Sequence, residues 1–341
     1  MVGDQFDALE AYEFAKNHQL KTFVLGGGSN ILVSDEGFNG LVIKVVNKGI
    51  EVINNNDNDV LLKVASGEVW DEVVKFAVKN NWWGIENLSR IPGSTGAIAV
   101  QNVGAYGQEA SKVIESVAVF NKETHQILNL PAANCGFAYR QSIFNSADKG
   151  KHIIFNIVFK LEKNGKPNLD YRDLKMKFQG QSPKPDQIRQ EIIAIRDKKF
   201  PFPKEAKLGN AGSFFKNPIL SPEAYQALKD RVLGEFGKEK VDELEKKKFL
   251  DSTILTAVKI VLKENQLNLV KVPAAFLIDL CGLKNLQSGG AGINPNQPLV
   301  IINQTGQATA RDVLNLANIV RQTVLAKTGI ELQFEPELIG F

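Results

Sequence analysis

Three glycine-rich loops in the first third of the chain constrain its fold more than any other feature. They run from Gly26 to Asn30, from Ile91 to Ala97 and from Gln101 to Gly107. Every glycine adds to the conformational entropy lost on folding. So many glycines would therefore be unnecessarily destabilising if they only formed turns. A long dinucleotide, by contrast, needs several close approaches of backbone. The loops therefore predict a nucleotide-type cofactor.

The first loop does not match the common nucleotide motifs. It follows a strand-like run, Thr22 to Leu25, which is the setting in which backbone N–H groups bind phosphate. A G-x-G-x-x-G motif would need glycine in place of Ile31, and Leu-Val-Ser-Asp follows where a helix should begin. A Walker lysine is also missing from the loop. These facts exclude a Rossmann-type site and a P-loop triphosphatase.

Composition and charge limit the kinds of protein that this chain can be. A chain of 341 residues with 43% hydrophobic and 23% charged residues is typical of a folded protein with two or three domains. The net charge of +3 is too small to indicate binding to nucleic acid or to a membrane surface. No apolar run is long enough to span a membrane. Cys135, Cys281 and the three histidines lack disulfide or metal-ligand spacing. We expect a cytoplasmic protein without a bound metal, nucleic-acid partner or membrane partner.

Hydrophobic periodicity predicts a mixed sheet with helices in the first half of the chain. Helices are expected around Phe6 to Phe14 and Trp70 to Ala77. Strands are expected at 22–25, 41–45, 51–53, 60–64, 114–120 and 153–161.

The second half is expected to be more helical. Gly180 to Asp186 is a connector with two prolines, and a helix from Ile188 should end near Phe200. The Lys- and Glu-rich stretch from Gln226 to Lys263 has the spacing of a solvated helical face, to which we assign no chemistry. A last helix should stop at Gly329 and be followed by a strand from Ile330 to Phe334.

One hydroxyl stands out in the run Gly-Asn-Ala-Gly-Ser-Phe-Phe-Lys-Asn-Pro from Gly209 to Pro218. The glycines permit positive φ, the two phenylalanines could exclude water, and Ser213 could then donate a proton. Taken alone, the run is better explained as a tight turn with a capping serine.

Two further runs also contain residue types suited to catalysis: Phe137 to Phe144 and Glu335 to Glu337. With the three loops and the Ser213 run, they resemble the UDP-N-acetylenolpyruvoylglucosamine reductases, the MurB flavoproteins of peptidoglycan and cell-wall synthesis. The segments follow the family's order from about residue 9 to the end of the chain. The pairing of Tyr-Arg-x-Ser-Ile-Phe with Ala-Gly-Ser-Phe-Phe-Lys-Asn-Pro is highly specific. A tyrosine loop at Tyr171 is similar to that of the type I subclass.

The resemblance implies an α+β or α/β fold with a two-part FAD-binding module of the PCMH or vanillyl-alcohol-oxidase type and a smaller α+β substrate-binding domain. Residues 1–48 with 330–341 would form the first FAD-binding part, and residues 49–186 the second. Residues 187–329 would bind the substrate.

The implied enzyme is an NADPH-dependent UDP-N-acetylmuramate dehydrogenase with non-covalent FAD, and we expect a monomer. Hydride would pass from NADPH to FAD, then from flavin N5 to C3 of the enolpyruvyl group of UDP-N-acetylenolpyruvoylglucosamine. Ser213 would give a proton to C2. Arg140 would stabilise the developing carboxylate charge, and Glu337 would be the catalytic glutamate.

The other matched positions are assigned to binding. The cofactor positions implied are Gly26, Gly27, Gly28, Ser29, Asn30, Pro92, Gly93, Ser94, Gly96, Asn102, Gly104, Ala105, Gly107 and Arg196. The substrate positions implied are Tyr139, Tyr171, Lys199, Asn217, Lys284 and Gln297.

Two departures from the family keep alternatives open. Relatives usually begin with a further Asn-Thr segment, so FAD affinity is the property in question, and the Lys-rich stretch at 235–265 is longer than expected. The chain could instead be a flavin oxidase of the same fold with another substrate. It could also be a catalytically inactive flavin- or nucleotide-binding module.

Overall fold

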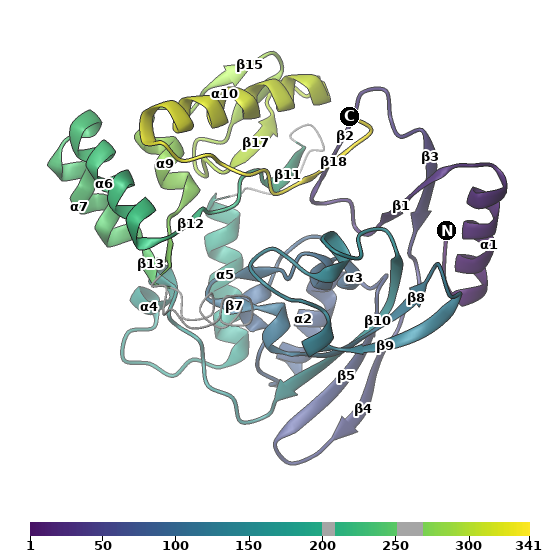
Figure 1. The fold of residues 1–341 in the computed structure, drawn as a ribbon. Helices are drawn as coiled ribbons and strands as arrows, with labels where there is room; N and C mark the ends of the chain where they lie inside the picture. Colours follow the sequence, from purple (N-terminus) through teal and green to yellow (C-terminus); the bar gives the residue numbers. More distant parts are fainter. Residues whose placement is uncertain (200–208, 251–268) are drawn as a thin grey trace. The chain divides into compact units, whose positions relative to one another are not determined.

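The computed structural model describes residues 1–199, 209–250 and 269–341 (Figure 1). Contacts between Cα atoms divide the chain into two compact units. Unit 1 comprises Met1–Gly28 and Asn39–Lys198, and unit 2 comprises Ser29–Phe38 and Lys199–Phe341. The finer division into three parts stays a prediction.

Unit 1 contains a five-stranded antiparallel sheet, a parallel strand pair and helices. Its helices are α1 (Gln5–Asn17), α2 (Trp70–Lys79), α3 (Thr95–Val100), α4 (Arg172–Lys177) and α5 (Pro185–Lys199), with short 3-10 turns η1 (Glu86–Leu88), η2 (Ala110–Lys112), η3 (Ala132–Asn134) and η4 (Ile143–Asn145). Its strands are β1 (Lys21–Leu25), β3 (Gly40–Lys44), β4 (Ile50–Asn55), β5 (Asp59–Ala65), β6 (Gly104–Ala105), β7 (Gln108–Glu109), β8 (Ile114–Asn121), β9 (Gln126–Pro131) and β10 (His152–Glu162).

The parallel pair β1–β3 leads into the first glycine loop, and α1 packs against it (Figure 1, purple). The side chain of Asp4 caps α1 by accepting hydrogen bonds from the N–H groups of Phe6 and Asp7. Tyr12 stacks on Phe120 at a ring-centroid distance of 6.0 Å within the small core of this layer. The helix and both strands expected here are confirmed.

The five-stranded sheet has the order β4-β5-β10-β8-β9, with β10 at its centre. Ile157 of β10 pairs with Val64 of β5 on one side and with Val117 of β8 on the other. Residues of α2 that recur with helical spacing are buried in the same core, and the indole of Trp70 donates a hydrogen bond to the Leu88 carbonyl at 3.0 Å. All the strands predicted for this sheet are confirmed, and β9 is an addition that the sequence analysis missed.

A partly buried ion pair joins α5 to α2. Arg189 donates two hydrogen bonds to the Asp71 carboxylate, at 2.6 and 2.8 Å, and the Arg90 N–H donates a third at 2.5 Å. Burial raises the pKa of Asp71, but these donors and their positive charges outweigh burial, so the pKa lies below its ordinary value. The helix begins at Pro185, three residues before the expected start at Ile188, because proline is well suited to the first turn of a helix. Its expected end at Phe200 lies outside the described residues.

Unit 2 is built on a four-stranded sheet of order β11-β17-β16-β15. Its described helices are α6 (Pro222–Phe236), α7 (Lys238–Lys247), α9 (Ala274–Leu280) and α10 (Ala310–Thr328). Its described strands are β2 (Ile31–Val33), β11 (Asn210–Ser213), β12 (Ile219–Leu220), β13 (Phe249–Leu250), β14 (Val270–Lys271), β15 (Gln287–Ser288), β16 (Ala291–Ile293), β17 (Val300–Asn303) and β18 (Glu337–Ile339).

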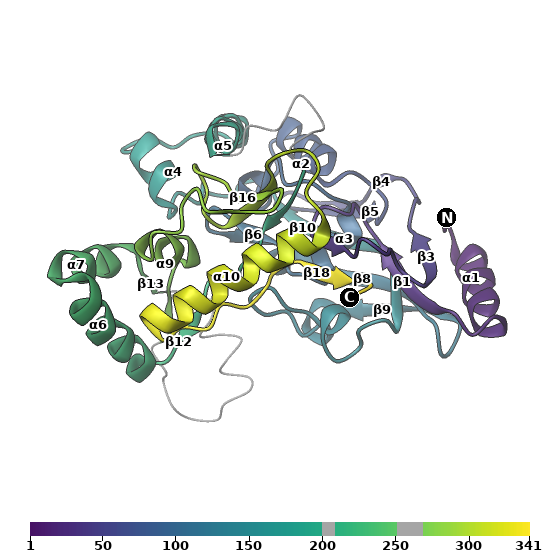
Figure 2. The ribbon, with the colours of Figure 1, turned by 90° about the horizontal axis from the view of Figure 1, so that it is seen from above.

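The long helix α10 packs against this sheet (Figures 1 and 2, yellow). A capping box of Thr309 and Asp312 starts the helix, and Gly329 ends it at φ 73° as predicted. The Asp35 carboxylate also accepts hydrogen bonds from the N–H groups of Ala310 and Arg311, at 2.7 and 3.1 Å. This contact joins residues 29–38 to the start of α10.

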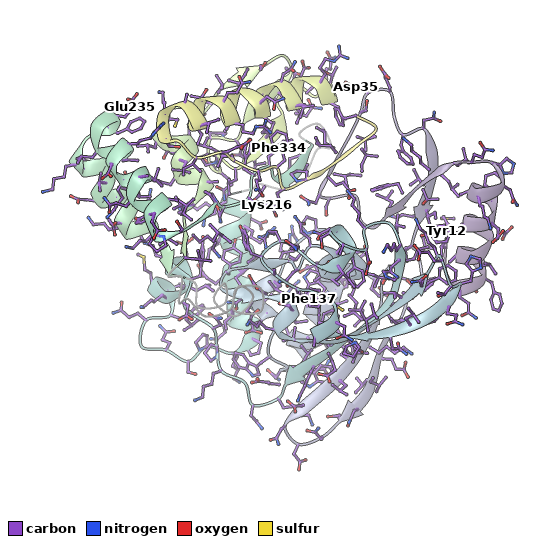
Figure 3. All side chains as sticks on the ribbon, viewed as in Figure 1. Tyr12, Asp35, Phe137, Lys216, Glu235 and Phe334 are labelled. Carbon is purple, nitrogen blue, oxygen red and sulfur yellow. The ribbon has the colours of Figure 1, made fainter. Side chains whose placement is uncertain are left out.

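The strand predicted from Ile330 to Phe334 is wrong. This segment forms a single bridge, Phe215 to Phe334, and the last strand is β18, which pairs in parallel with β2. Pro336, which has no N–H to donate, separates the two pairings. Figure 3 labels Lys216 and Phe334 on the two segments that meet at this bridge.

Among the described residues, no helix is long and apolar enough to span a membrane. The same part of the chain contains no cluster of three or more His, Cys, Asp or Glu side chains that could hold a metal.

Replacing Asp71 with Asn should lower the free energy of unfolding near pH 7 by about 2 kcal/mol, since it removes charged hydrogen bonds from a mostly buried site. Because the folded-state pKa is depressed, this contribution is present above the ordinary Asp pKa and is lost as the pH falls through the depressed value. Urea unfolding at several pH values should therefore show a flatter acid limb for Asp71→Asn.

The control is Glu72→Gln, which removes the exposed pair with Lys75 on the same helix and should change stability by less than about 0.5 kcal/mol. Equal effects of the two variants would contradict the structural role of Asp71.

Candidate functional site

The first two glycine loops meet backbone to backbone in unit 1. A Cβ atom at Gly27 would lie 2.4 Å from the Cα of Gly93 and 2.9 Å from the N of Ser94. A Cβ atom at Gly26 would lie 2.8 Å from the Ser94 hydroxyl. Lys44 of β3 also donates a hydrogen bond to the Gly26 carbonyl. The two loops thus form a cradle that requires glycine at these positions.

The second loop is held by neighbouring backbone. The Gly93 carbonyl accepts from the N–H of Trp70 at 3.1 Å, and the Gly96 N–H donates to the Ser66 carbonyl at 2.9 Å. A Cβ atom at Gly96 would approach Ser66 to 2.9 Å. Pro92 precedes Gly93, whose φ of 122° is one that residues with a side chain rarely adopt.

The third loop is held by Arg140, which lies on a separate turn of the chain. The guanidinium donates a hydrogen bond to the Gly104 carbonyl at 2.9 Å and lies 5.2 Å from the ring centroid of Tyr139. A Cβ atom at Gly104 would lie 3.4 Å from the Arg140 Nη1, so glycine leaves room for the cation. Arg140 has φ 54°, a strained backbone for an arginine. Such strain marks a position that the surrounding structure determines closely.

Asn102 holds the turn that carries Arg140. Its side chain is 1% exposed, donates to the Ala138 carbonyl at 2.9 Å and accepts from the Ser111 N–H at 3.0 Å. Both ends of this amide therefore bond within the protein. Asn102 is therefore placed to support the third loop from within, whereas Gly104 and Ala105 form a short strand that pairs with β7.

Arg196 offers a charged group for a cofactor. It lies seven residues after Arg189 on α5, almost two turns along the same face. Its Nε is buried and has no hydrogen-bond partner among the described residues. A buried donor without a partner and the cradle at Gly27 and Gly93 both fit the pyrophosphate of a dinucleotide such as FAD.

Ser213 ends strand β11 in unit 2. The pairing of β11 with β17 shifts between Asn210 and Ser213, and Gly212 has φ 75°, so the strand is bulged just before the serine. Phe214 and Phe215 are fully buried in the core of unit 2. The segment is thus a bulged strand end and not the tight turn that the run alone also allowed.

Asn30 brings Ser213 and Glu337 toward one place in unit 2. A Cβ atom at Gly212 would lie 3.8 Å from the Ser29 carbonyl oxygen and 4.0 Å from the Asn30 side-chain oxygen. The Asn30 backbone carbonyl accepts a hydrogen bond from the Glu337 N–H at 3.1 Å, and its side-chain amide donates to the Glu335 carbonyl at 3.3 Å. The end of the first glycine loop therefore contacts the segments of both predicted catalytic groups.

Two predicted substrate positions lie near Ser213. The Asn217 side chain accepts from the Ala274 N–H at the start of α9, at 2.9 Å. Gln297 is half-buried in the turn before β17, and its carbonyl accepts from Val300, the residue paired with Ser213. Both residues thus adjoin the strand end that carries the serine.

The remaining substrate positions are placed differently. Lys284 forms an exposed ion pair with Asp279 at 2.8 Å and precedes β15, at the sheet edge opposite β11. Lys199 is the last residue of α5. In unit 1, the Tyr171 ring meets the Tyr106 ring edge to face at 4.9 Å. Unit 1 contains Arg140, Tyr139 and Tyr171, and unit 2 contains Ser213 and Glu337.

Sequence reasoning missed two asparagines that hold the loops of unit 1, Asn87 and Asn168. Asn87 is fully buried, and its side chain donates to the backbone of both the third glycine loop and the segment before Tyr171. No spacing rule marks an isolated asparagine, and the short run Ile-Glu-Asn-Leu gave no signal beyond its place before the second loop.

Comparison with known proteins identifies the class first. A family model of the FAD binding domain matches residues 2–129, which include all three glycine loops. A model of the UDP-N-acetylenolpyruvoylglucosamine reductase C-terminal domain matches residues 203–339, which include Ser213 and Glu337. The protein is thus a flavoprotein with an FAD-binding domain.

Relatives then identify the family. The chain is 39% identical to UDP-N-acetylenolpyruvoylglucosamine reductase of Neisseria gonorrhoeae, over 92% of this chain and 83% of the relative. It is 36% identical to the reductase of Flavobacterium johnsoniae, over 98% of this chain and 94% of the relative. The chain belongs to the UDP-N-acetylenolpyruvoylglucosamine reductase (MurB) family.

A solved structure supports the same fold. The crystal structure of MurB from Thermus caldophilus matches with a TM-score of 0.63 and 23% identity, over 99% of this chain and 90% of that one. The predicted mixed α/β fold, with an FAD-binding domain followed by a MurB C-terminal domain, is therefore confirmed.

The variant Gly27→Ala should weaken FAD binding at least about tenfold, because the added methyl group would overlap the backbone of Gly93 and force the loops apart. Titration of the FAD-free protein by flavin fluorescence would measure this, with circular dichroism as a check on folding.

Gly234→Ala in α6 is the matched control, since a Cβ atom there would meet nothing within 4 Å. Unchanged FAD affinity in a folded Gly27→Ala protein would show that the contact between these two loops is not part of the cofactor site.

Proposed function

We propose that this protein reduces the enolpyruvyl double bond of UDP-N-acetylenolpyruvoylglucosamine with NADPH, forming UDP-N-acetylmuramate for peptidoglycan synthesis. Membership of the reductase family over nearly the whole chain supports this. The structural observation that carries it is the convergence of the Ser213 and Glu337 segments on Asn30, at the end of the first glycine loop.

FAD held at the glycine loops would supply one half of the addition, a hydride that comes from NADPH and adds to C3 of the enolpyruvyl group. The protein must supply the other half, a proton at C2. Ser213 is our candidate donor. An alcohol is a weak acid, but the carbanion-like C2 is basic enough to take its proton. The bulge at Gly212 fixes the direction of this side chain at the end of β11.

Charge must be compensated as hydride arrives, because negative charge develops at C2 and on the adjoining carboxylate. Arg140 is proposed to stabilise that charge, since a planar guanidinium pairs well with a carboxylate. Its hydrogen bond to Gly104 and its contact with Tyr139 fix the guanidinium in unit 1. Glu337, whose N–H is bonded to Asn30, is proposed as the catalytic glutamate.

Substrate binding is assigned by the same resemblance. Lys199 and Lys284 are proposed to bind the pyrophosphate and carboxylate of the substrate, with Tyr139, Asn217 and Gln297 as neighbours. The Lys284 ammonium pairs with Asp279 in this structure. Tyr171 is proposed to close over the substrate, which makes the protein a type I enzyme. We further propose that it acts as a monomer in the cytoplasm.

Replacing Ser213 with Ala should slow reoxidation of the reduced flavin by the enolpyruvyl substrate by about 10²- to 10⁴-fold, the usual contribution of a positioned acid. Reduction of the flavin by NADPH should keep its rate, because that step needs no proton from the serine. Anaerobic stopped-flow absorbance would follow the two half-reactions separately.

Ser221→Ala is the control, since it removes a hydroxyl from the same unit at the N-cap of α6. It should cost about 1 kcal/mol of stability and leave both half-reactions intact. Wild-type turnover in Ser213→Ala would end the proposed role. Flavin reoxidized by oxygen but not by the substrate would favour an oxidase, and absence of flavin would favour an inactive module.

A further inference from the structure

The side chain of Asn87 joins two loops of unit 1. This residue lies in η1 and is fully buried. Its amide donates to the Tyr106 carbonyl at 2.7 Å and to the Asn168 carbonyl at 2.9 Å. Tyr106 belongs to the third glycine loop, and Asn168 belongs to the segment 163–171, which connects β10 to α4 and ends at Tyr171. We call this segment the tyrosine loop.

A second set of contacts joins the same two loops. The Asn168 side chain donates to the Gly107 carbonyl at 3.0 Å and accepts from the Asp170 N–H at 3.2 Å. A Cβ atom at Gly107 would lie 3.0 Å from the Asn168 side-chain oxygen, so glycine permits this approach. The edge-to-face contact of Tyr106 and Tyr171 completes the junction. The two loops therefore lie against each other as one body.

Buried polar groups fix the position of Asn87. Its backbone N–H donates to the Gln108 side-chain oxygen at 2.8 Å, and the Gln108 amide donates to the Glu86 carboxylate at 2.7 Å. The other Glu86 oxygen accepts from the Gly84 N–H at 2.7 Å. Connected hydrogen bonds of this kind restrict the motion of their members, although the Asn87 Oδ1 atom is buried without a hydrogen-bond partner among the described residues. Two carbonyls face the Asn87 side chain, so it must be a double donor, which neither aspartate nor alanine can be.

From these contacts we propose that Asn87 is a positioning residue that couples the cofactor to the substrate: FAD bound at the third glycine loop orders the tyrosine loop through Asn87. The inference rests on the proposed function, which assigns the two loops to cofactor and substrate. Its physical basis is that ordering one loop lowers the entropy that the other must lose, since a buried side chain links them.

Hydrogen exchange of the full chain, with and without FAD, tests the coupling directly. In the wild-type protein FAD should slow exchange in residues 101–107 and also in residues 163–171. In Asn87→Ala, FAD should still protect 101–107, but its effect on 163–171 should fall by about tenfold or more. Asn168→Ala, which leaves the buried Asn87 in place, should reduce the same protection partly.

Steady-state kinetics provide a second readout. Asn87→Ala should raise the KM for the enolpyruvyl substrate by about tenfold, with a smaller change in kcat and an unchanged rate of flavin reduction by NADPH. Asn134→Ala, at an exposed position of η3, is the matched control and should leave exchange and kinetics unchanged.

Each contrary result overturns the inference in a distinct way. Protection of 101–107 without protection of 163–171 in the wild-type protein would show that the loops are not coupled. Equal protection of 163–171 in the wild type and in Asn87→Ala would show that Asn87 does not carry the coupling. Lack of protection at both loops would show that FAD does not bind at the third loop. The exchange experiment needs no turnover, so failure of the role proposed for Ser213 would leave its outcome unaffected.

Discussion

The contact between the backbones at Gly27 and Gly93 is the constraint on which the candidate cofactor site depends. With no side chain at either position, the first two loops cross closely enough that a single methyl group would overlap the opposing chain. This geometry turns two surface loops into a surface of backbone that can approach a dinucleotide. The strands β1 and β3 and the helix α2 then serve to bring the loops to the crossing.

Short polar side chains do much of the positioning around that crossing. Asn102 supports the turn of Arg140, Asn87 holds two loops, and Asp71 fixes α5 and with it Arg196. Loops have backbone carbonyls and N–H groups without strand partners, and these must be paired when they are buried. Amide and carboxylate side chains meet that need here, so the order of the site is specified by single residues far apart in sequence.

That distribution explains what could be predicted from the sequence. Most regular elements could be predicted, because periodic apolar residues indicate them. The helix α10, its stop at Gly329 and the strands of the five-stranded sheet other than β9 follow from local pattern. The strand expected at Ile330 to Phe334 was wrong because its alternating apolar residues are buried without a strand partner. Ile330 and Leu332 are buried, Phe334 is partly buried beside Phe214, and the segment forms only one bridge. Asn87 could not be found, because its partners lie 19 and 81 residues away. The glycine loops and the Ser213 run were recognised because they depart from any packing period.

The parallel pairing of β2 with β18 has a consequence for biogenesis. Residues 31–33 are synthesised well before their strand partner, Glu337–Ile339, because Asn30 and Glu335 are 305 residues apart in the sequence. Until residues 335–339 have been synthesised, Asn30 has neither the Glu335 carbonyl nor the Glu337 N–H to bind, and the edge of β2 is uncovered. This part of unit 2 can therefore close only late in synthesis, and a chain that stopped before Glu337 would leave β2 without its strand partner.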